Sequence, residues 1–195
     1  GGFTALQRMP GWFPLTLAYG CFGFMYLLIL GFLTTRLEDD SGWTSVDASV
    51  AFSILGVAMI FGGPVLTTLA QRLGVRRILS VAFGLWPVFT VILLSGITLP
   101  VWLACVGIGF LFSALPSLIT LYVVEHTTTE DYGASYAAAT LVFGIAQTIS
   151  PPIGGWIADT AGSFTLVFLL SAAISLVGLV ATLRLPGKGG LLKVK

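Results

Sequence analysis

Hydrophobic residues along this chain form long runs that charged residues interrupt only at intervals. Most of these uncharged runs exceed 20 residues, and none alternates apolar and polar positions as a membrane β-strand would. The longest one contains the turn-forming stretch Ser95–Pro100 near its middle. The runs are residues 9–35 (27 residues), 48–71 (24), 78–124 (47), 132–158 (27) and 160–183 (24).

These lengths predict membrane-spanning helices. A hydrocarbon core of about 30 Å requires about 20 apolar residues in helical form, so the 47-residue run accommodates two helices. We therefore predict an all-α integral membrane protein with six spans. They lie near 13–35, 47–70, 78–95, 99–124, 133–157 and 164–184.

Composition supports this class and excludes others. The chain has 195 residues, of which 56% are hydrophobic and 9% charged, whereas soluble domains have about 25% charged residues. Cys21 and Cys105 lie within apolar runs and His126 is the single histidine, so we expect no metal site, no cofactor and no disulfide. No acid–base pair lies within a span, which argues against an enzyme. We expect the lipid bilayer, and not a nucleic acid, as the surrounding partner.

The placement of Lys and Arg predicts the orientation. With six spans, eight of the nine basic residues fall on one side of the membrane and Arg36 falls on the other. Basic residues favour the cytoplasmic side, so we expect both termini to be cytoplasmic. The basic side comprises Arg8, Arg72, Arg76, Arg77, Arg184, Lys188, Lys193 and Lys195.

Two stretches resemble one another at an offset of 88 residues. GGPVLTTLAQRLG (62–74) aligns with SPPIGGWIADTAG (150–162), and Pro64 meets Pro152 while Gly74 meets Gly162. Each stretch begins late in a predicted helix, and three spans separate the two. An odd number of spans inverts the topology, so we predict a 3+3 inverted repeat, which is typical of secondary transporters.

The loop between the second and third predicted helices resembles a family signature. LAQRLGVRR (69–77) is similar to the Gly-x-Leu-Ala-Asp-Arg-x-Gly-Arg-Arg loop of the major facilitator superfamily, with Gln71 in place of the Asp. The resemblance implies a cytoplasmic gate loop that includes Gln71, Arg72, Gly74, Arg76 and Arg77. Because the family's Asp takes part in a charge relay, Gln71 puts that role in doubt for this copy.

Further stretches suggest which part of the superfamily this is. AYGCFGFMY (18–26), FGGP (61–64) and TEDYGASYAAATLVFGIAQ (129–147) resemble its YbfB/YjiJ-type branch, and SPPIGG (150–155) resembles an antiporter element. The match is to the C-terminal six-helix half. It implies that residues 1–12 end a cytoplasmic linker, that 13–184 form the half, and that 185–195 are a basic tail.

The resemblance also implies a function. We expect a secondary transporter that moves a small organic solute by alternating access against an N-terminal six-helix half, in a bacterial inner membrane. The titrating residue of any proton coupling would lie in that other half, because no predicted span carries an ionisable residue at its middle. The alternatives are a stand-alone six-helix protein that acts as a homodimer or assembly partner and, less favoured, an intramembrane enzyme.

Candidate cavity residues follow from the helices that line the cavity in this family. We select polar or aromatic positions on one face of the first, fourth and fifth predicted helices. Their alternative role is structural, through packing between helices or hydrogen bonds within their own helix. The candidates are Tyr19, Phe22, Tyr26, Ser113, Ser117, Thr120 and Gln147.

Small residues and prolines within the spans are predicted to serve packing or bending. Glycines allow helices to approach closely in membranes, and proline removes a backbone donor. The residues concerned are Gly62, Gly63, Pro64, Pro116, Pro151, Pro152, Gly154 and Gly155.

Overall fold

The computed structural model describes residues 1–187 and contains no strand within them. Six helices are long and apolar enough to cross a membrane, which confirms the predicted fold class. They are α2 (Trp12–Leu30), α4 (Ser45–Leu73), α5 (Val75–Leu93), α6 (Thr98–His126), α7 (Thr129–Ala161) and α8 (Thr165–Leu183). Three short elements complete the fold: α1 (Gly2–Arg8), α3 (Leu33–Thr35) and the π-helical turn η1 (Arg36–Asp40). Lys188, Lys193 and Lys195 of the predicted tail lie outside the described residues.

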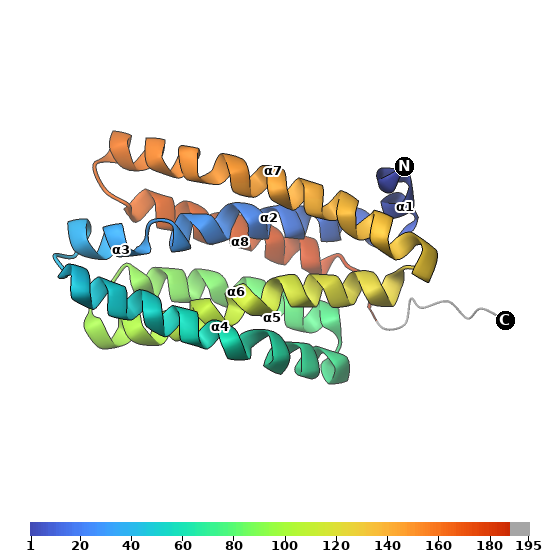
Figure 1. Cartoon of the computed structure of the whole chain (residues 1–195), viewed down its shortest axis with the longest axis horizontal. Coiled ribbons are helices and arrows are strands. Elements are labelled where there is room, and N and C mark those ends of the chain that lie inside the picture. Colours follow the sequence, from blue (N-terminus) through green and yellow to red (C-terminus); the bar gives the residue numbers. More distant parts are fainter. Residues whose placement is uncertain (188–195) are drawn as a thin grey trace.

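The helices form two groups that lie side by side along the long axis of the molecule. Figure 1 shows α2, α7 and α8 on one side and α4, α5 and α6 on the other. Each group mixes the two predicted repeat units. The first helix of one unit, α2, packs on α7 and α8 of the other, and α6 packs on α4 and α5 in the same way. This exchange is what an inverted repeat requires.

One close helix crossing occurs twice at related positions. A Cβ added to Gly109 of α6 would collide with the carbonyl group of Leu55 in α4, and a Cβ added to Gly23 of α2 would lie 2.6 Å from the carbonyl oxygen of Phe143 in α7. An offset of 88 residues carries Leu55 to Phe143, and one of 86 carries Gly23 to Gly109. Only glycine permits both backbones to approach this closely.

A second repeated contact lies two turns further along α4 and α7, and one residue further along α6 and α2. A Cβ added to Gly62 of α4 would collide with the carbonyl group of Phe110 in α6. At the related positions, Ser150 of α7 donates a hydrogen bond of 2.5 Å from Oγ to the carbonyl oxygen of Phe24 in α2. The offsets are again 88 and 86 residues. The spacing that relates the two sequence stretches therefore also relates their helix contacts.

Serine hydroxyls connect α8 to the neighbouring core helices. Ser171 Oγ accepts a hydrogen bond from Trp86 Nε1 of α5 at 2.9 Å and donates to the carbonyl oxygen of Met25 in α2 at 2.8 Å. Ser175 Oγ donates to the carbonyl oxygen of Phe83 at 2.7 Å. Polar groups in an apolar interior require such partners, so these serines fix how α8 sits against α2 and α5.

The first span is shorter than the predicted 13–35. Helix α2 ends at Leu30, and the chain continues through α3 into η1. The Arg36 guanidinium, which is 7% exposed, pairs with Asp40 at 2.9 Å and donates to the carbonyl oxygen of Leu94 at the end of α5. Asp40 in turn accepts from the backbone N–H of Phe164 before α8. This buried ion pair connects η1 to the end of α5 and to the start of α8, at the end of the bundle opposite the termini. The chain bends after Leu30, and this bend places Arg36 and Asp40 in reach of both helices.

The turn between α6 and α7 is tighter than the loop predicted over residues 125–132. Only Thr127 and Thr128 separate the two helices. The N-cap of α7 is Thr128, which has an extended backbone and whose hydroxyl accepts a hydrogen bond from the Asp131 N–H at 3.2 Å. Glu130 and Asp131 occupy the first turn of α7, where acidic residues are favourable.

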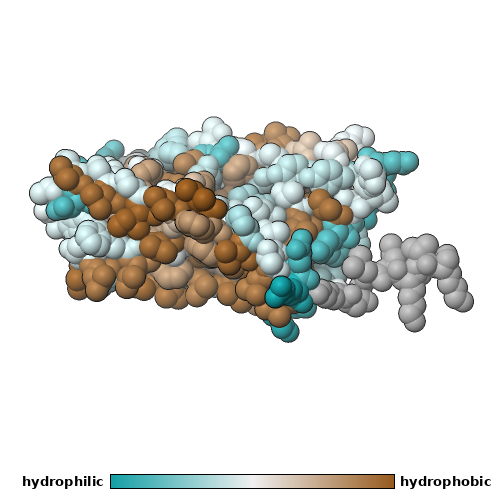
Figure 2. All heavy atoms as spheres, turned by 60° about the horizontal axis from the view of Figure 1, so that its bottom comes forward, coloured by the Kyte–Doolittle hydropathy of each residue, from teal (hydrophilic) through white to brown (hydrophobic). Residues whose placement is uncertain are grey.

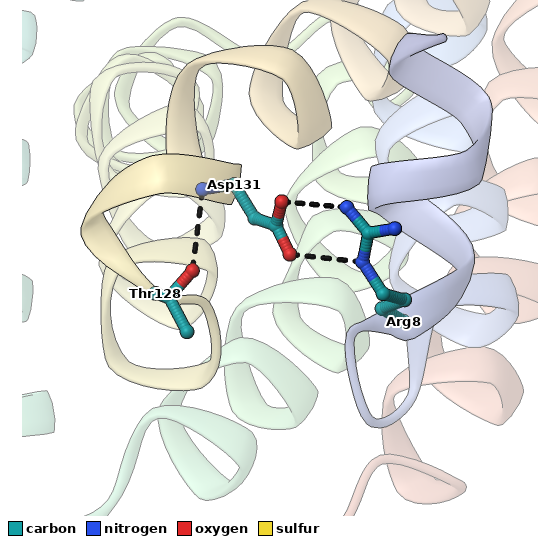
Figure 3. A network of polar contacts seen from close by, with 3 residues as sticks. All are labelled: Arg8, Thr128 and Asp131. Atoms are coloured by element: carbon teal, nitrogen blue, oxygen red, sulfur yellow. Dashed lines mark hydrogen bonds and ion pairs between the residues drawn. The ribbon is translucent and has the colours of Figure 1, made fainter.

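The short helix α1 docks on this same turn. Arg8 donates two hydrogen bonds to the Asp131 carboxylate, at 3.0 Å from Nε and 2.7 Å from the terminal nitrogen, as Figure 3 shows. Tyr122 Oη of α6 donates to the carbonyl oxygen of Pro10 at 2.7 Å. The segment predicted to end a linker is thus a helix held by α6 and α7, at the end of the bundle where α8 also finishes (Figure 1).

The repeated glycine crossings predict a specific pattern of stability. Gly109→Ala and Gly23→Ala should each destabilise the protein by about 1–3 kcal/mol, because the new methyl group meets backbone that cannot move aside. The measurement is thermal unfolding of the solubilised protein. The controls are Gly56→Ala and Gly144→Ala, whose Cβ atoms would have nothing within 4 Å. Equal effects of all four substitutions would contradict the close crossing.

The Arg8–Asp131 pair predicts a change in protease sensitivity. Asp131→Asn should increase the rate of trypsin cleavage after Arg8, because α1 loses its charged anchor on α7. Cleavage is followed by mass spectrometry. Glu130→Gln, which removes the neighbouring acid, should leave the rate unchanged. If both variants are cleaved at the same rate as the parent protein, the ion pair does not hold α1.

Candidate functional site

An aromatic cluster joins α2, α6 and α7. Tyr19 stacks on Phe143 with ring centroids 4.7 Å apart, and Tyr26 lies 5.1 Å from both Phe22 and Phe112. Tyr19 and Phe22 are almost fully buried, with 4% and 1% of their surface exposed, while Tyr26 is half-buried. The predicted positions on α2 therefore do lie together, and Tyr26 is the most exposed of the three.

A hydrogen bond between Tyr26 and Gln147 closes this cluster across two helices. Tyr26 Oη donates to Gln147 Oε1 at 2.7 Å. Both side chains are half-buried. An amide within a span requires partners, and the carbonyl oxygen of Gln147 has one in Tyr26. The amide nitrogen and the phenol oxygen still provide hydrogen-bonding capacity for a solute.

A second polar group lies on the same side of α7, closer to its start. Tyr136 Oη and Thr120 Oγ1 of α6 share a hydrogen bond of 3.3 Å. Tyr136 also packs near Tyr132, with centroids 5.9 Å apart, and near Tyr19 at 6.4 Å. Aromatic rings with hydroxyls at their edges thus extend along α7 for several turns.

The other predicted hydroxyls form hydrogen bonds with backbone groups of the bundle. Ser113 Oγ accepts from the backbone N–H of Gly63 in α4 at 3.0 Å. Ser117 and Thr120 donate to carbonyl oxygens one turn back on their own helix, those of Ser113 and Pro116. The structural alternative therefore accounts for Ser117, and Thr120 combines it with the contact to Tyr136.

The predicted gate residues form the α4–α5 connection. Gly74 has φ +101°, a conformation that other residues rarely adopt, and it is the only residue between the two helices. Gln71, Arg72, Arg76 and Arg77 are exposed around it. Arg76 donates a hydrogen bond of 2.6 Å to the carbonyl oxygen of Leu183 at the end of α8, a position that favours a cation.

The predicted packing residues fall into two groups. Gly62, Gly63 and Gly154 have close neighbours on another helix, whereas Gly155 has open space around its Cα, so close packing does not account for Gly155. The four predicted prolines lie inside long helices, which continue past them. They are Pro64 in α4, Pro116 in α6, and Pro151 and Pro152 in α7.

Sequence analysis missed several members of the aromatic cluster. Phe112, Tyr136 and Phe143 contact the predicted residues in space. Their signal is present in 129–147: Tyr132, Tyr136, Phe143 and Gln147 recur at intervals of four, seven and four residues, which places them on one helical face. Phe112 has no such pattern, because it belongs to a helix that is apolar on all sides.

A six-helix membrane bundle, built as an inverted repeat around an uncharged aromatic face, has the architecture of half a secondary transporter. Comparison with protein families agrees with this class. Residues 15–192 match the model of the Major Facilitator Superfamily, and the chain belongs to this family. The match defines the superfamily and does not test the branch within it, which stays a prediction.

The chain is also similar to individual transporters and, in its fold, to a solved structure. It is 27% identical to the raffinose permease of Escherichia coli over 177 residues, covering 80% of this chain and 41% of the permease. It is 27% identical to monocarboxylate transporter 12 of Rattus norvegicus, covering 80% of this chain and 32% of that protein. The fold resembles the crystal structure of the fucose:proton symporter of Escherichia coli, with a TM-score of 0.74, 18% identity, and coverage of 93% of this chain and 44% of the symporter. The chain thus spans less than half the length of these relatives.

The contact between Tyr26 and Gln147 predicts a measurable coupling. Tyr26→Phe and Gln147→Leu should each destabilise the protein, and the double variant should lose less than the sum of the two. Double-mutant cycles within membrane bundles average about 0.6 kcal/mol of coupling. The measurement is unfolding of the four proteins in one detergent. A cycle with Tyr132→Phe in place of Tyr26→Phe should give no coupling, and additivity in both cycles would contradict the bond.

Proposed function

We propose that this chain is the C-terminal half of a secondary active transporter that moves a small organic solute by alternating access. The observation that carries the proposal is the half-buried pair Tyr26–Gln147 within an aromatic cluster of α2, α6 and α7. Aromatic faces stack on organic rings, and phenol and amide groups orient them by hydrogen bonds. Membership of the superfamily supports transport as the purpose of this arrangement.

The proposed partner is a second six-helix unit that packs on the exposed faces of the bundle. Helices α4 and α7 are the least buried of the six, with 28% and 17% of the most apolar stretch of each helix buried inside the bundle. Figure 2 shows one face of the bundle, on which hydrophobic residues cover much of the left part and the lower edge while the right end is more polar. Helix α7 contributes to the aromatic cluster, and α4 packs on α6, which contributes Phe112. A partner half packed across α4 and α7 would enclose the solute between the units.

The chemistry of this face favours a solute that is uncharged where it contacts this half. The aromatic cluster contains Tyr, Phe, Gln and Thr side chains, and within the described residues its ring contacts involve no charged group. The relatives include a raffinose permease, and the fold neighbour is a fucose symporter. A sugar ring, with apolar faces and hydroxyls at its rim, suits such a surface. A carboxylate or a coupled proton would be held by the other half.

The gate and the orientation complete the proposal. Gly74 joins α4 and α5 through a single residue, and Arg76 connects this joint to the end of α8. These contacts would brace the cytoplasmic end while the two halves rock against one another. Both termini would face the cytoplasm of a bacterium, as the distribution of basic residues favours.

A homodimer of the six-helix unit is the second candidate. The two halves of this superfamily are related by an axis along the membrane normal, so two copies could enclose a cavity in the same way. The exposed faces of α4 and α7 serve either arrangement. The mass of the protein in its native membrane distinguishes them, because a chain near 20.6 kDa would favour the homodimer and one about twice as large the two-half transporter.

Transport assays test the proposed function. Cells that overproduce the protein should accumulate or extrude a labelled solute from a panel of neutral mono- and oligosaccharides and monocarboxylates, and Gln147→Leu should reduce the rate about tenfold or more. This loss is expected because a buried polar group of the substrate that loses its hydrogen-bond partner typically costs that much in binding or rate. Tyr132→Phe serves as the matched control at the edge of the face. Transport by Gln147→Leu at the parent rate would remove this residue from the solute path.

A further inference from the structure

An apolar groove opens on the side of the bundle formed by α2 and α8. It measures about 400 Å³ and lies between the start of α2 and the last turns of α8. Phe13 and Leu17 form one wall, and Val177 and Val180 form the other. All four side chains are exposed, Phe13 to 60%. The groove is therefore a surface feature of the membrane-spanning region, separate from the cluster of α2, α6 and α7.

A single charged residue lies at the end of this groove. Arg184 follows the last residue of α8, is exposed, and lines the groove together with the apolar side chains. Within residues 1–187, the two ion pairs found are Arg8–Asp131 and Arg36–Asp40, so no described acid neutralises Arg184. A guanidinium at the level where a span ends, beside an apolar channel, matches the layout of a phospholipid.

The other side of α8 repeats this arrangement. A second groove of about 280 Å³ is lined by Arg76, Arg77, Val81 and Leu183. Arg76 is engaged with the carbonyl oxygen of Leu183, and Arg77 is exposed. Arginines on both sides thus make the end of α8 basic, while its grooves are apolar.

We propose that the groove between α2 and α8 binds an anionic phospholipid. One acyl chain lies against Leu17, Val177 and Val180, and the phosphate accepts hydrogen bonds from Arg184. The anionic headgroup is selected because it neutralises Arg184 without bringing a cation to this basic end, as a choline headgroup would. Phosphate bound by guanidinium is a strong, charge-assisted contact, and the bilayer supplies this ligand at high local concentration.

The test compares two lipids with identical chains. The full chain, purified and delipidated in detergent, is titrated with dioleoylphosphatidylglycerol or dioleoylphosphatidylcholine, and bound lipid is counted by native mass spectrometry. The parent protein should retain the anionic lipid in preference to the zwitterionic one. Arg184→Gln should reduce this preference about fivefold, as expected for one arginine at a lipid surface, and Arg184→Lys should retain most of it.

Two further variants separate the groove from general surface charge. Val180→Trp fills the groove and should weaken retention of both lipids. Arg72→Gln removes the same charge at the same end of the bundle, away from the groove, and should leave the preference unchanged. Equal retention of the two lipids by the parent protein would overturn the proposal. So would an effect of Arg72→Gln as large as that of Arg184→Gln, which would indicate nonspecific attraction, or displacement of the anionic lipid by glycerol phosphate alone, which would indicate a site for free phosphate.

Discussion

The close approach of helix backbones at glycine is the constraint on which the rest of this structure depends. Lipid tails are as apolar as leucine side chains, so burial alone gives membrane helices little reason to associate. Van der Waals contact between backbones and a few internal hydrogen bonds must do so instead. Gly109 against Leu55 and Gly23 against Phe143 provide that contact once between α6 and α4 and once between α2 and α7, so each crossing joins one repeat unit to the other. Because the two crossings are related by the repeat, they place α2 and α6 at equivalent positions, and the aromatic cluster forms where α2 meets α7.

The polar contacts of the bundle follow from the same environment. Inside a span, each hydroxyl, amide or indole N–H needs a partner. Ser171 and Ser175 meet this need between helices, and Ser117 meets it within its own helix. Tyr26 and Gln147 also satisfy one another, but on a half-buried surface. That difference in burial separates Ser171 and Ser175, which are fully buried and hold the fold, from the two half-buried groups that we propose to serve the solute.

The sequence predicted the architecture because the bilayer makes strong demands on it. Charge-free runs of sufficient length had to be helices, and the 88-residue offset between 62–74 and 150–162 revealed the repeat that the contacts of Gly62 and Ser150 now display. The bend after Leu30 was not predictable, because it depends on Arg36 reaching the end of α5. Phe112 was missed for a related reason: no period marks it, and only the packing of α6 on its neighbours brings it to Tyr26.

Reaction of an engineered thiol tests the central claim, that the face around Tyr26 and Gln147 opens to water as a solute path. Gln147→Cys is made in a background where Cys21 and Cys105 are alanine and is treated in membranes with a charged methanethiosulfonate reagent. Leu176→Cys, at an exposed apolar position in α8, is the comparison. The account predicts modification of the first thiol and none of the second, because charged reagents attack only thiolates that water can reach. Equal inertness of both thiols would contradict a water-accessible path at this face.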